Sequence, residues 1–277
     1  MNNKIAVYSV PRPNVRSYFE LIDAVSEYGA KALEGFCHFE LAVPDFDNAK
    51  RIREYADKKN IVCPCFSVFA DLSLGDPGEK VEKLCRFADV AKILGSPYLH
   101  HTIIGECVDY GRVLGRKEEL FELGIKAVRE ITDYAASIGI KTVYEDQGFI
   151  FNGVEGFGRF LSAVERDVGV VADMGNICQC GGNIHDFISA FGNKVCHVHV
   201  KDWNIYDSKP DRNVLPALNG KFCADAEIGL GGIDIARAVE QLKALGYSGY
   251  YAVEYTSPDE NGASYLRGLE RLENWIG

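Results

Sequence analysis

Four residues of the sequence, Glu145, Asp173, His199 and Glu254, place a carboxylate or an imidazole next to an apolar run. A charge beside such a run costs free energy unless it has a partner. Three carboxylates and one histidine brought to one place would repel one another unless a cation lay among them. Three oxygen ligands and one nitrogen ligand suit a divalent ion such as Mn²⁺ or Mg²⁺. The pattern therefore predicts a metal site, provided that the fold brings these four residues together.

Each of these residues also has an ordinary structural role. Asp173 could cap the next turn, Glu254 could pair with a lysine, and His199 could be a hydrogen-bonded core histidine. Their joint occurrence at the ends of four successive strand-like runs favours the metal site. His197 and His199 share a face of one run, because side chains alternate along a strand. His199 is preferred as the ligand because it lies nearer the C-terminal end of the run.

Lys201 and Asn176 are further candidates for the same site. Lys201 lies two residues beyond His199 and projects from the same face of an extended chain, where it could steady a developing oxyanion or a substrate hydroxyl. Pairing of Lys201 with Asp202 or Glu227 is an equally weighted alternative. Asn176 lies three residues after Asp173, and its amide can hydrogen-bond a substrate hydroxyl.

Other candidates for substrate contact are histidines and an aromatic residue near predicted strand ends. His100 and His101 close the fourth run, and we expect one of them to face the site, although alternation alone does not say which. His38 and Trp203 follow strand ends, where an aromatic face suits the apolar side of a sugar. Packing is the alternative role for each of them.

The elements that must position these residues alternate regularly along the chain. Short β-branched or aromatic runs predict eight strands at 5–10, 32–36, 61–67, 98–103, 141–145, 169–173, 195–201 and 249–254. Amphipathic segments with apolar residues at three- and four-residue steps, such as 81–94 and 121–138, predict helices between them. No Gly-x-Gly-x-x-Gly pattern follows the first strand, which favours a closed (β/α)8 barrel over a doubly wound α/β sheet. We expect one barrel domain over residues 1–277, with a long irregular functional loop at about 203–232.

In such a barrel the C-terminal ends of the strands meet at one mouth, where the active site lies. The composition supports a small-molecule partner there. With 30 Lys and Arg against 40 Asp and Glu, the formal net charge is −10, which disfavours nucleic-acid binding. No signal peptide or membrane-spanning run is visible, and the 9 cysteines lie in apolar runs that suit reduced thiols. We therefore expect a cytoplasmic protein, with assembly into a homodimer or homotetramer left open.

Four segments carry a resemblance to a known family. Residues 171–176 and 253–254, the His-x-His-x-Lys-Asp run at 197–202 and the Gly-x-Gly-Gly-x-Asp turn within 227–234 resemble the xylose isomerase-like TIM-barrel superfamily. Within it, the chain is most similar to the sugar phosphate isomerase/epimerase branch, which includes ketose 3-epimerases, hydroxypyruvate isomerase and inosose dehydratase. The resemblance runs over essentially the whole chain.

The resemblance implies that Glu145, Asp173, His199 and Glu254 hold one divalent ion, with Mn²⁺ or Mg²⁺ preferred and Zn²⁺ or Co²⁺ as alternatives. It also implies that the two glutamates form an acid/base pair across the substrate. Many members have a histidine at the position of Asn176. Asparagine cannot shuttle a proton, so the substrate and the reaction stay open at this point.

These features together predict an isomerase or epimerase of a small sugar or polyol ketone that works through an enediolate. A metal-dependent lyase or dehydratase on the same scaffold is the alternative, because removal of the same proton can lead to elimination. A non-catalytic sugar-binding subunit and a DNA-repair endonuclease are less favoured. Whether the substrate carries a phosphate is left open.

Overall fold

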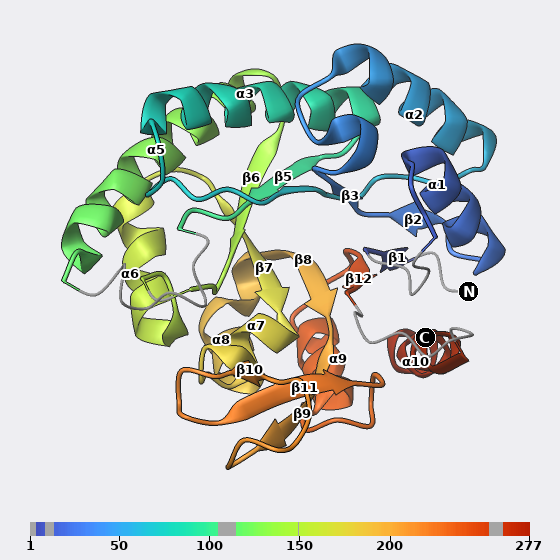
Figure 1. Ribbon diagram of the computed structural model, residues 1–277, viewed down its shortest axis with the longest axis vertical. Coiled ribbons are helices and arrows are strands. Elements are labelled where there is room, and N and C mark those ends of the chain that lie inside the picture. Colours follow the sequence, from blue (N-terminus) through green and yellow to red (C-terminus); the bar gives the residue numbers. More distant parts are fainter. Residues whose placement is uncertain (1–3, 9–13, 105–114, 149, 255–262) are drawn as a thin grey trace.

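The computed structural model describes residues 4–8, 14–104, 115–148, 150–254 and 263–277. Its centre is a parallel sheet of nine strands that curls into a ring, with helices on the outside (Figure 1). In spatial order the strands are β2 (Ala32–Leu33), β1 (Ile5–Val7), β12 (Tyr251–Val253), β8 (Val195–Val200), β7 (Gly169–Asp173), β6 (Lys141–Glu145), β5 (Tyr98–His101), β4 (Phe66–Val68) and β3 (Gly35–Phe36). The predicted α/β barrel is confirmed.

The segment 32–36 closes the ring. Its first part, β2, pairs with β1, and its second part, β3, pairs with β4. Backbone hydrogen bonds continue across the junction, because the Glu34 amide donates to the Val7 carbonyl at 2.9 Å and the Gly35 amide donates to the Cys65 carbonyl at 3.0 Å. One predicted strand therefore serves both neighbours.

The helices alternate with the strands as the sequence pattern indicates. They are α1 (Tyr18–Glu27), α2 (Phe46–Lys58), α3 (Pro77–Leu94), α5 (Lys117–Ser137), α6 (Gly153–Val164), α7 (Met174–Gln179), α8 (Ile184–Phe191), α9 (Ile235–Ala244) and α10 (Ala263–Ile276), with short 3-10 helices η1 (Phe39–Leu41) and η2 (Gly192–Lys194). Local signals explain their ends. Helix α3 begins where the Asp76 carboxylate accepts from the Glu79 amide, and it ends at Gly95, which adopts a positive φ of 75°.

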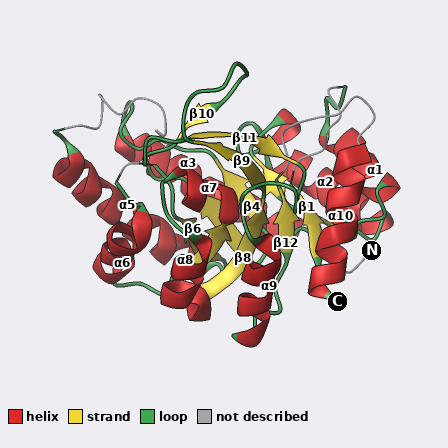
Figure 2. Ribbon diagram, turned by 90° about the horizontal axis from the view of Figure 1, so that it is seen from below, coloured by secondary structure: helices red, strands yellow, loops and turns green. Residues whose placement is uncertain are grey.

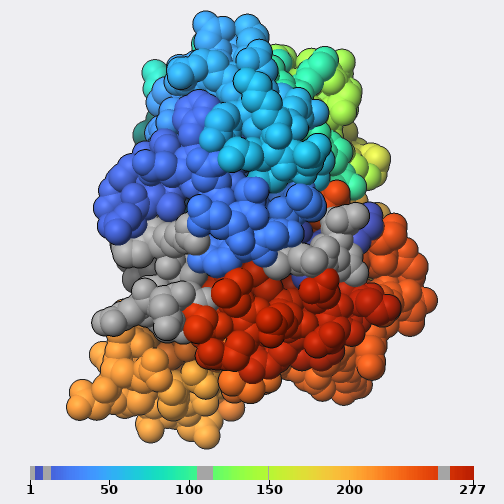
Figure 3. All heavy atoms as spheres, turned by 90° about the vertical axis from the view of Figure 1, so that its right-hand side faces the viewer, coloured from blue at the N-terminus to red at the C-terminus, as the bar shows by residue number. Residues whose placement is uncertain are grey.

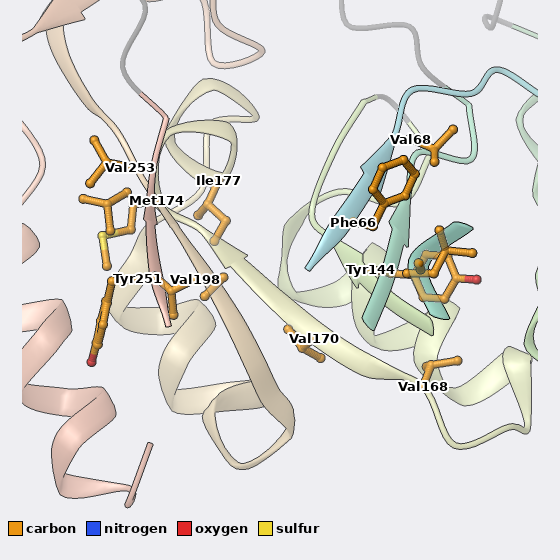
Figure 4. Packing of buried hydrophobic residues seen from close by; sticks show 14 of the residues in the cluster. Phe66, Val68, Tyr144, Val168, Val170, Met174, Ile177, Val198, Tyr251 and Val253 are labelled. Atoms are coloured by element: carbon orange, nitrogen blue, oxygen red, sulfur yellow. The ribbon is translucent and has the colours of Figure 1, made fainter. Parts of the chain in front are cut away.

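Most of the hydrophobic core lies between the strands and the helices. Outward side chains of the strands, such as Phe66, Tyr144 and Val198, pack there against the inner helix faces (Figure 4). Burying one such side chain contributes about 1.5–3 kcal/mol. The inside of the ring is filled below its mouth by smaller groups, which are Ala6, Ala32 and Ala252 on one side and Cys65, Val143 and Val171 on the other.

The last helix packs beside the first part of the chain. Figure 3 shows α10, in red, next to the N-terminal segment that contains α1 and α2. The ring of Tyr265 on α10 lies 5.2 Å from the ring of Tyr28, just after α1. None of the helices in the described ranges is long and apolar enough to span a bilayer.

The sequence led us to expect an irregular loop at about 203–232. The structure instead shows a small antiparallel sheet in this segment. Its strands are β9 (Asp202–Tyr206), β10 (Leu215–Pro216) and β11 (Phe222–Ala226), and they lie at one end of the barrel (Figure 2). These strands are short, and Asp202, Asn204 and Asp225 interrupt their apolar residues, so their hydrophobic pattern is weak. The Asp202 carboxylate accepts the backbone amides of Gly229 and Gly231, both at 2.9 Å, and so ties the end of this segment to its start.

Candidate active site

Strand alternation places one polar side chain from each wall of the barrel at its mouth. Side chains two residues apart on a strand share a face, and the inward residues next in line above the small apolar fill are Tyr8, Glu34, Ser67, His100, Glu145, Asp173, His199 and Glu254. For example, Val143 and Glu145 both point inward from β6, and Ala252 and Glu254 do so at the end of β12. The barrel thus gathers at one level residues that are far apart in the sequence.

The four predicted metal ligands meet around one atom, Nδ1 of His199. Oε2 of Glu145 lies 3.2 Å from it, Oδ2 of Asp173 lies 3.3 Å away, and Oε2 of Glu254 lies 3.8 Å away. Asp173 and His199 are buried, whereas the Glu254 side chain keeps 22% of its surface exposed. The ligand atoms of Glu145, Asp173 and His199 all lie within 4.8 Å of one another.

Lys201 points into the same site. Its ammonium lies 3.1 Å from Asp173 Oδ2 and 3.0 Å from Glu254 Oε2. The alternative partners considered from the sequence are engaged elsewhere, because Asp202 accepts backbone amides and Glu227 pairs with Arg267 and Arg271. Lys201 therefore brings a positive charge among the acidic groups.

Asn176 and Asp173 are linked at the start of α7. One oxygen of Asp173 caps this helix by accepting from the Asn176 backbone amide at 2.7 Å, while the other oxygen faces His199 and Lys201. The Asn176 side chain donates to Glu145 Oε1 and accepts from Lys201, both at 3.1 Å. Asp173 thus takes both roles that the sequence suggested for it, the cap and a place in the acidic cluster.

The acidic cluster shifts the protonation of its members in the metal-free chain. Burial raises the pKa of Glu254 to about 7, and the Lys201 ammonium offsets this only in part. Burial also raises the pKa of Asp173, but Lys201 and His199 outweigh it and lower that pKa to about 2. Burial would lower the pKa of His199, yet the carboxylates of Glu34, Asp173 and Glu145 raise it well above its usual value.

These groups fit a divalent cation. Among the described residues, the buried Oε2 atom of Glu145 has no hydrogen-bond partner, and it faces the point where the other ligand atoms converge. Three carboxylates and one imidazole form the mixed oxygen and nitrogen set that Mn²⁺ and Mg²⁺ accept, and Zn²⁺ or Co²⁺ tolerate. The site can therefore hold a metal ion.

Glu34 belongs to the site, although the sequence analysis did not select it. This fully buried carboxylate accepts hydrogen bonds from Ser67 Oγ at 2.5 Å, His197 Nε2 at 2.6 Å and His199 Nε2 at 3.1 Å. The available signal was a single acidic residue inside an apolar strand, on the face shared with Ala32. His197, which the sequence left as the less favoured of two histidines, contacts Glu34 instead of the acidic cluster.

A cavity of about 200 Å³ opens next to the acidic cluster. Its lining includes an aromatic side formed by Tyr8, Phe36 and Phe69, and a polar side that includes His100, Gln147, Asn176, Lys201 and Glu254. The ring of Tyr8 stacks on His199 with centroids 5.2 Å apart. Phe36 and Gln147 were not anticipated. Phe36 ends the predicted strand 32–36 but carries no polar group, and Gln147 lies two residues beyond the predicted strand 141–145.

The structure does not bring three of the predicted substrate contacts to this cavity. His101 points outward from β5, where its Nε2 lies 2.9 Å from the Tyr144 hydroxyl. His38 packs against Tyr18 and Phe39, with ring centroids 5.0 Å and 4.2 Å away. Trp203 is buried and donates from its indole to the Gly175 carbonyl at 2.9 Å. Of the two histidines that close β5, His100 is the one at the cavity.

The sequence was also compared with known protein families. A sequence model described as "Xylose isomerase-like TIM barrel" matches residues 22–275. The chain belongs to this family. The eight-walled barrel with its polar mouth agrees with that assignment.

Two curated relatives are about a quarter identical to this xylose isomerase-like protein over the residues that align. An uncharacterised protein of Methanocaldococcus jannaschii is 25% identical over 240 residues, which cover 83% of this chain and 75% of the relative. The inosose isomerase of Bacillus subtilis is 27% identical over 150 residues, which cover 52% of this chain and 50% of the relative. The second match thus spans about half of that enzyme.

Solved structures of the xylose isomerase-like fold superpose over nearly the whole chain. The D-psicose 3-epimerase of Clostridium cellulolyticum, solved with D-tagatose, has a TM-score of 0.76 at 16% identity and covers 99% of both chains. A xylose isomerase-like protein of Mycobacterium smegmatis in complex with magnesium has a TM-score of 0.73 at 17% identity, covering 94% of this chain and 88% of that one. A probable 3-DHS dehydratase of Bacillus anthracis has a TM-score of 0.73 at 14% identity, covering 98% and 99%. These likenesses show the shared fold.

Proposed function

We propose that this protein is a divalent-metal-dependent isomerase or epimerase of a small sugar or polyol ketone. The observation that carries the proposal is the convergence of Glu145, Asp173 and Glu254 on His199 Nδ1, beside a cavity with one aromatic and one polar side. The related inosose isomerase and the epimerase and magnesium-containing structures of the same fold support the assignment.

The chemistry proposed for the site is proton transfer at a carbon next to a carbonyl. When bound, a divalent ion supplies Lewis-acid stabilisation of the negative charge that develops on the substrate oxygens. Glu145 and Glu254 extend from β6 and from the end of β12, which are separated in the ring by β7 and β8. One glutamate removes the carbon-bound proton to give an enediolate, and the other returns a proton from the opposite side.

The remaining residues at the cavity hold the substrate and its charge. Lys201 lines the cavity next to Glu254, with its ammonium 3.0 Å from Glu254 Oε2. Its positive charge stabilises the negative charge that develops on a substrate oxygen. Asn176 hydrogen-bonds both Glu145 and Lys201 and so links these two side chains, and the second N–H of its amide can donate to a substrate hydroxyl. The rings of Tyr8 and Phe69 suit the apolar face of a sugar.

Solvent isotope exchange tests the proposed reaction. A panel of unphosphorylated and phosphorylated ketoses and inososes is incubated with the protein and Mn²⁺ in D₂O. After the metal is removed, the products are followed by NMR. We expect deuterium to enter the carbon next to the carbonyl of recovered ketose, with an isomer or epimer as product. Loss of water from the substrate would identify a dehydratase instead. Binding of a sugar without exchange, in the presence of bound metal, would contradict the proposed catalysis.

Metal binding should weaken as the pH falls. The pKa of His199 is raised well above its usual value and that of Glu254 is raised to about 7, so in the metal-free chain near neutral pH His199 holds a proton and Glu254 is partly protonated. A metal ion has to displace these protons. Each displaced proton makes the apparent Kd weaker by about tenfold per pH unit below the pKa of that group. Calorimetric titration with Mn²⁺ at several pH values, in buffers of different ionisation enthalpy, measures the Kd and the protons released.

The Glu254→Gln variant is the matched control for this measurement, because it removes one of the two titrating groups and should release fewer protons. A Kd that stays constant between about pH 6 and pH 8, with no proton released, would contradict the assignment of His199 as a ligand.

A further inference from the structure

A buried hydrogen-bond network lies beside the acidic cluster and is centred on Glu34. Its Oε1 atom accepts from Ser67 Oγ and His199 Nε2, and its Oε2 atom accepts from His197 Nε2. Three side chains that can donate surround the two oxygens of this fully buried carboxylate, the arrangement that a buried ionised group requires. An ionised carboxylate can only accept hydrogen bonds. Ser67, His197 and His199 must therefore be the donors.

The network determines where His100 carries its proton. Ser67 has one hydroxyl proton and gives it to Glu34, so its oxygen must accept from the atom on its other side. That atom is His100 Nδ1, at 3.1 Å. His100 thus carries its proton on Nδ1. Burial lowers the pKa of this imidazole, which agrees with a neutral ring whose Nε2 has a free lone pair.

The ring nitrogen of His100 that is unpaired in the described part of the chain belongs to a residue of the cavity wall. His100 lines that cavity, and its buried Nε2 has no hydrogen-bond partner among the described residues. Oε1 of Glu145 lies 3.7 Å from this Nε2 atom, which is beyond hydrogen-bond distance. A substrate hydroxyl in the cavity would supply the missing donor.

The same network places the proton of His199 on its other ring nitrogen, Nε2, whereas His100 carries its proton on Nδ1. Its Nε2 donates to Glu34, which leaves Nδ1 directed at Glu145, Asp173 and Glu254. Metal-binding histidines commonly donate their second ring nitrogen to a carboxylate, which fixes the tautomer and the ring orientation. Glu34 occupies this place for His199.

We propose that Glu34 is a positioning residue with two branches. One branch turns Nδ1 of His199 toward the metal ion, and the other acts through Ser67 to leave Nε2 of His100 as an acceptor for a substrate hydroxyl. The identities of the ion and the substrate rest on the proposed function, whereas the proton positions do not.

Glu34, His197 and His199 also form a group whose ligand atoms are close enough to hold a cation of their own. The contacts favour the hydrogen-bond network, because both Glu34 oxygens already accept from donors and the distance from Glu34 to His197 is only 2.6 Å. A second bound ion would leave the Ser67 hydroxyl without its acceptor.

Nitrogen NMR of the histidine rings tests the proton positions directly. The chain has 6 histidines, and ¹⁵N-histidine labelling with single His→Gln variants assigns His100 and His199. With Mg²⁺ bound, we expect a proton on Nδ1 of His100 and on Nε2 of His199. In Ser67→Ala the His100 signal should shift toward the other tautomer while that of His199 stays unchanged. A wild-type His100 protonated on Nε2 would overturn the proposal, whatever the enzyme's activity.

Binding measurements separate the two branches. Glu34→Gln should weaken Mg²⁺ binding by about 10- to 100-fold, as loss of an outer partner of a metal-binding histidine does. Ser67→Ala should leave the Mg²⁺ Kd within about twofold, because Ser67 does not contact His199, and should raise KM by about five- to tenfold for one lost hydrogen bond. Ser67→Thr keeps the hydroxyl and should restore KM.

The surface variant Glu118→Gln removes an exposed partner of Arg159 that does not line the substrate cavity, and it is the control for a general effect of carboxylate loss. Equal weakening of Mg²⁺ binding in Ser67→Ala and Glu34→Gln would overturn the two-branch arrangement. Titration to two ions per wild-type chain and one per Glu34→Gln chain would show a second metal site in its place. If Glu34→Gln does not fold, Ser67→Ala and the NMR measurement still decide.

Discussion

Replacing Glu145 or Glu254 with glutamine should abolish turnover while the barrel stays folded. A glutamine amide has the shape of the glutamate but neither removes a proton nor carries the charge that attracts a cation. General acid–base groups contribute about 10²- to 10⁴-fold to a rate, so kcat should fall by at least this factor in each variant. Neutralising Glu145 relieves repulsion from the nearby carboxylates in the metal-free chain. Glutamine at position 254 resembles the protonated form that the raised pKa of Glu254 favours.

Steady-state kinetics at saturating Mn²⁺ gives kcat for both variants, and circular dichroism with a melting curve monitors the fold. Glu165→Gln serves as the matched control, since this glutamate pairs with Arg129 at the surface. The control should keep full activity. A kcat within about tenfold of the wild type in either site variant would refute the acid/base role of that glutamate.

The second large effect concerns the metal ion itself. Chelation should abolish activity and added Mn²⁺ should restore it, and Asp173→Asn should weaken the Mn²⁺ Kd by more than the about 10- to 100-fold that follows loss of an outer hydrogen-bond partner. The reason is that Asp173 is fully buried and directs one oxygen at His199 Nδ1. Calorimetry and activity measured at several Mn²⁺ concentrations report the two quantities.

Lys201→Met gives an informative contrast to Asp173→Asn. It removes the ammonium that now lies between Asp173 and Glu254, so the cluster becomes more negative and should bind Mn²⁺ at least as tightly as the wild type. Turnover should nevertheless fall, because the charge near the developing oxyanion is lost. Weaker Mn²⁺ binding in Lys201→Met would show that the ammonium organises the ligands instead of competing with the ion.

The sequence predicted the barrel and the acidic cluster for the same physical reason. Parallel strands buried on both faces are apolar, so a charged residue at the end of such a run is conspicuous, and the topology brings those ends together. Glu145, Asp173, His199 and Glu254 all stand at such ends. Their positions around one atom follow from the fold, while their roles in binding and catalysis stay proposals.

What the sequence did not reveal depends on strand register. Glu34 lies between the two-residue strands β2 and β3. A charged residue in the middle of a predicted strand does not mark a strand end, so it was not considered as a site residue. The choice between His100 and His101 follows from alternation only once the inward face of β5 is known. The pairing of Ser67 with His100 in adjacent strands then puts both side chains on the inner face. Trp203 lies just beyond β8, where the chain turns into β9 and the indole is drawn into the core.

The hydrogen bonds from Gly229 and Gly231 to Asp202 have a consequence for which parts of this barrel can vary in sequence. The carboxylate fixes both the departure and the return of the small antiparallel sheet directly beside Lys201. We therefore expect that residues 207–213, which connect β9 and β10 and are mostly exposed, can be lengthened, shortened or exchanged without displacing the end of β8. The connection between β9 and β10 is therefore a place where the surface around the cavity can change while the acidic cluster stays the same.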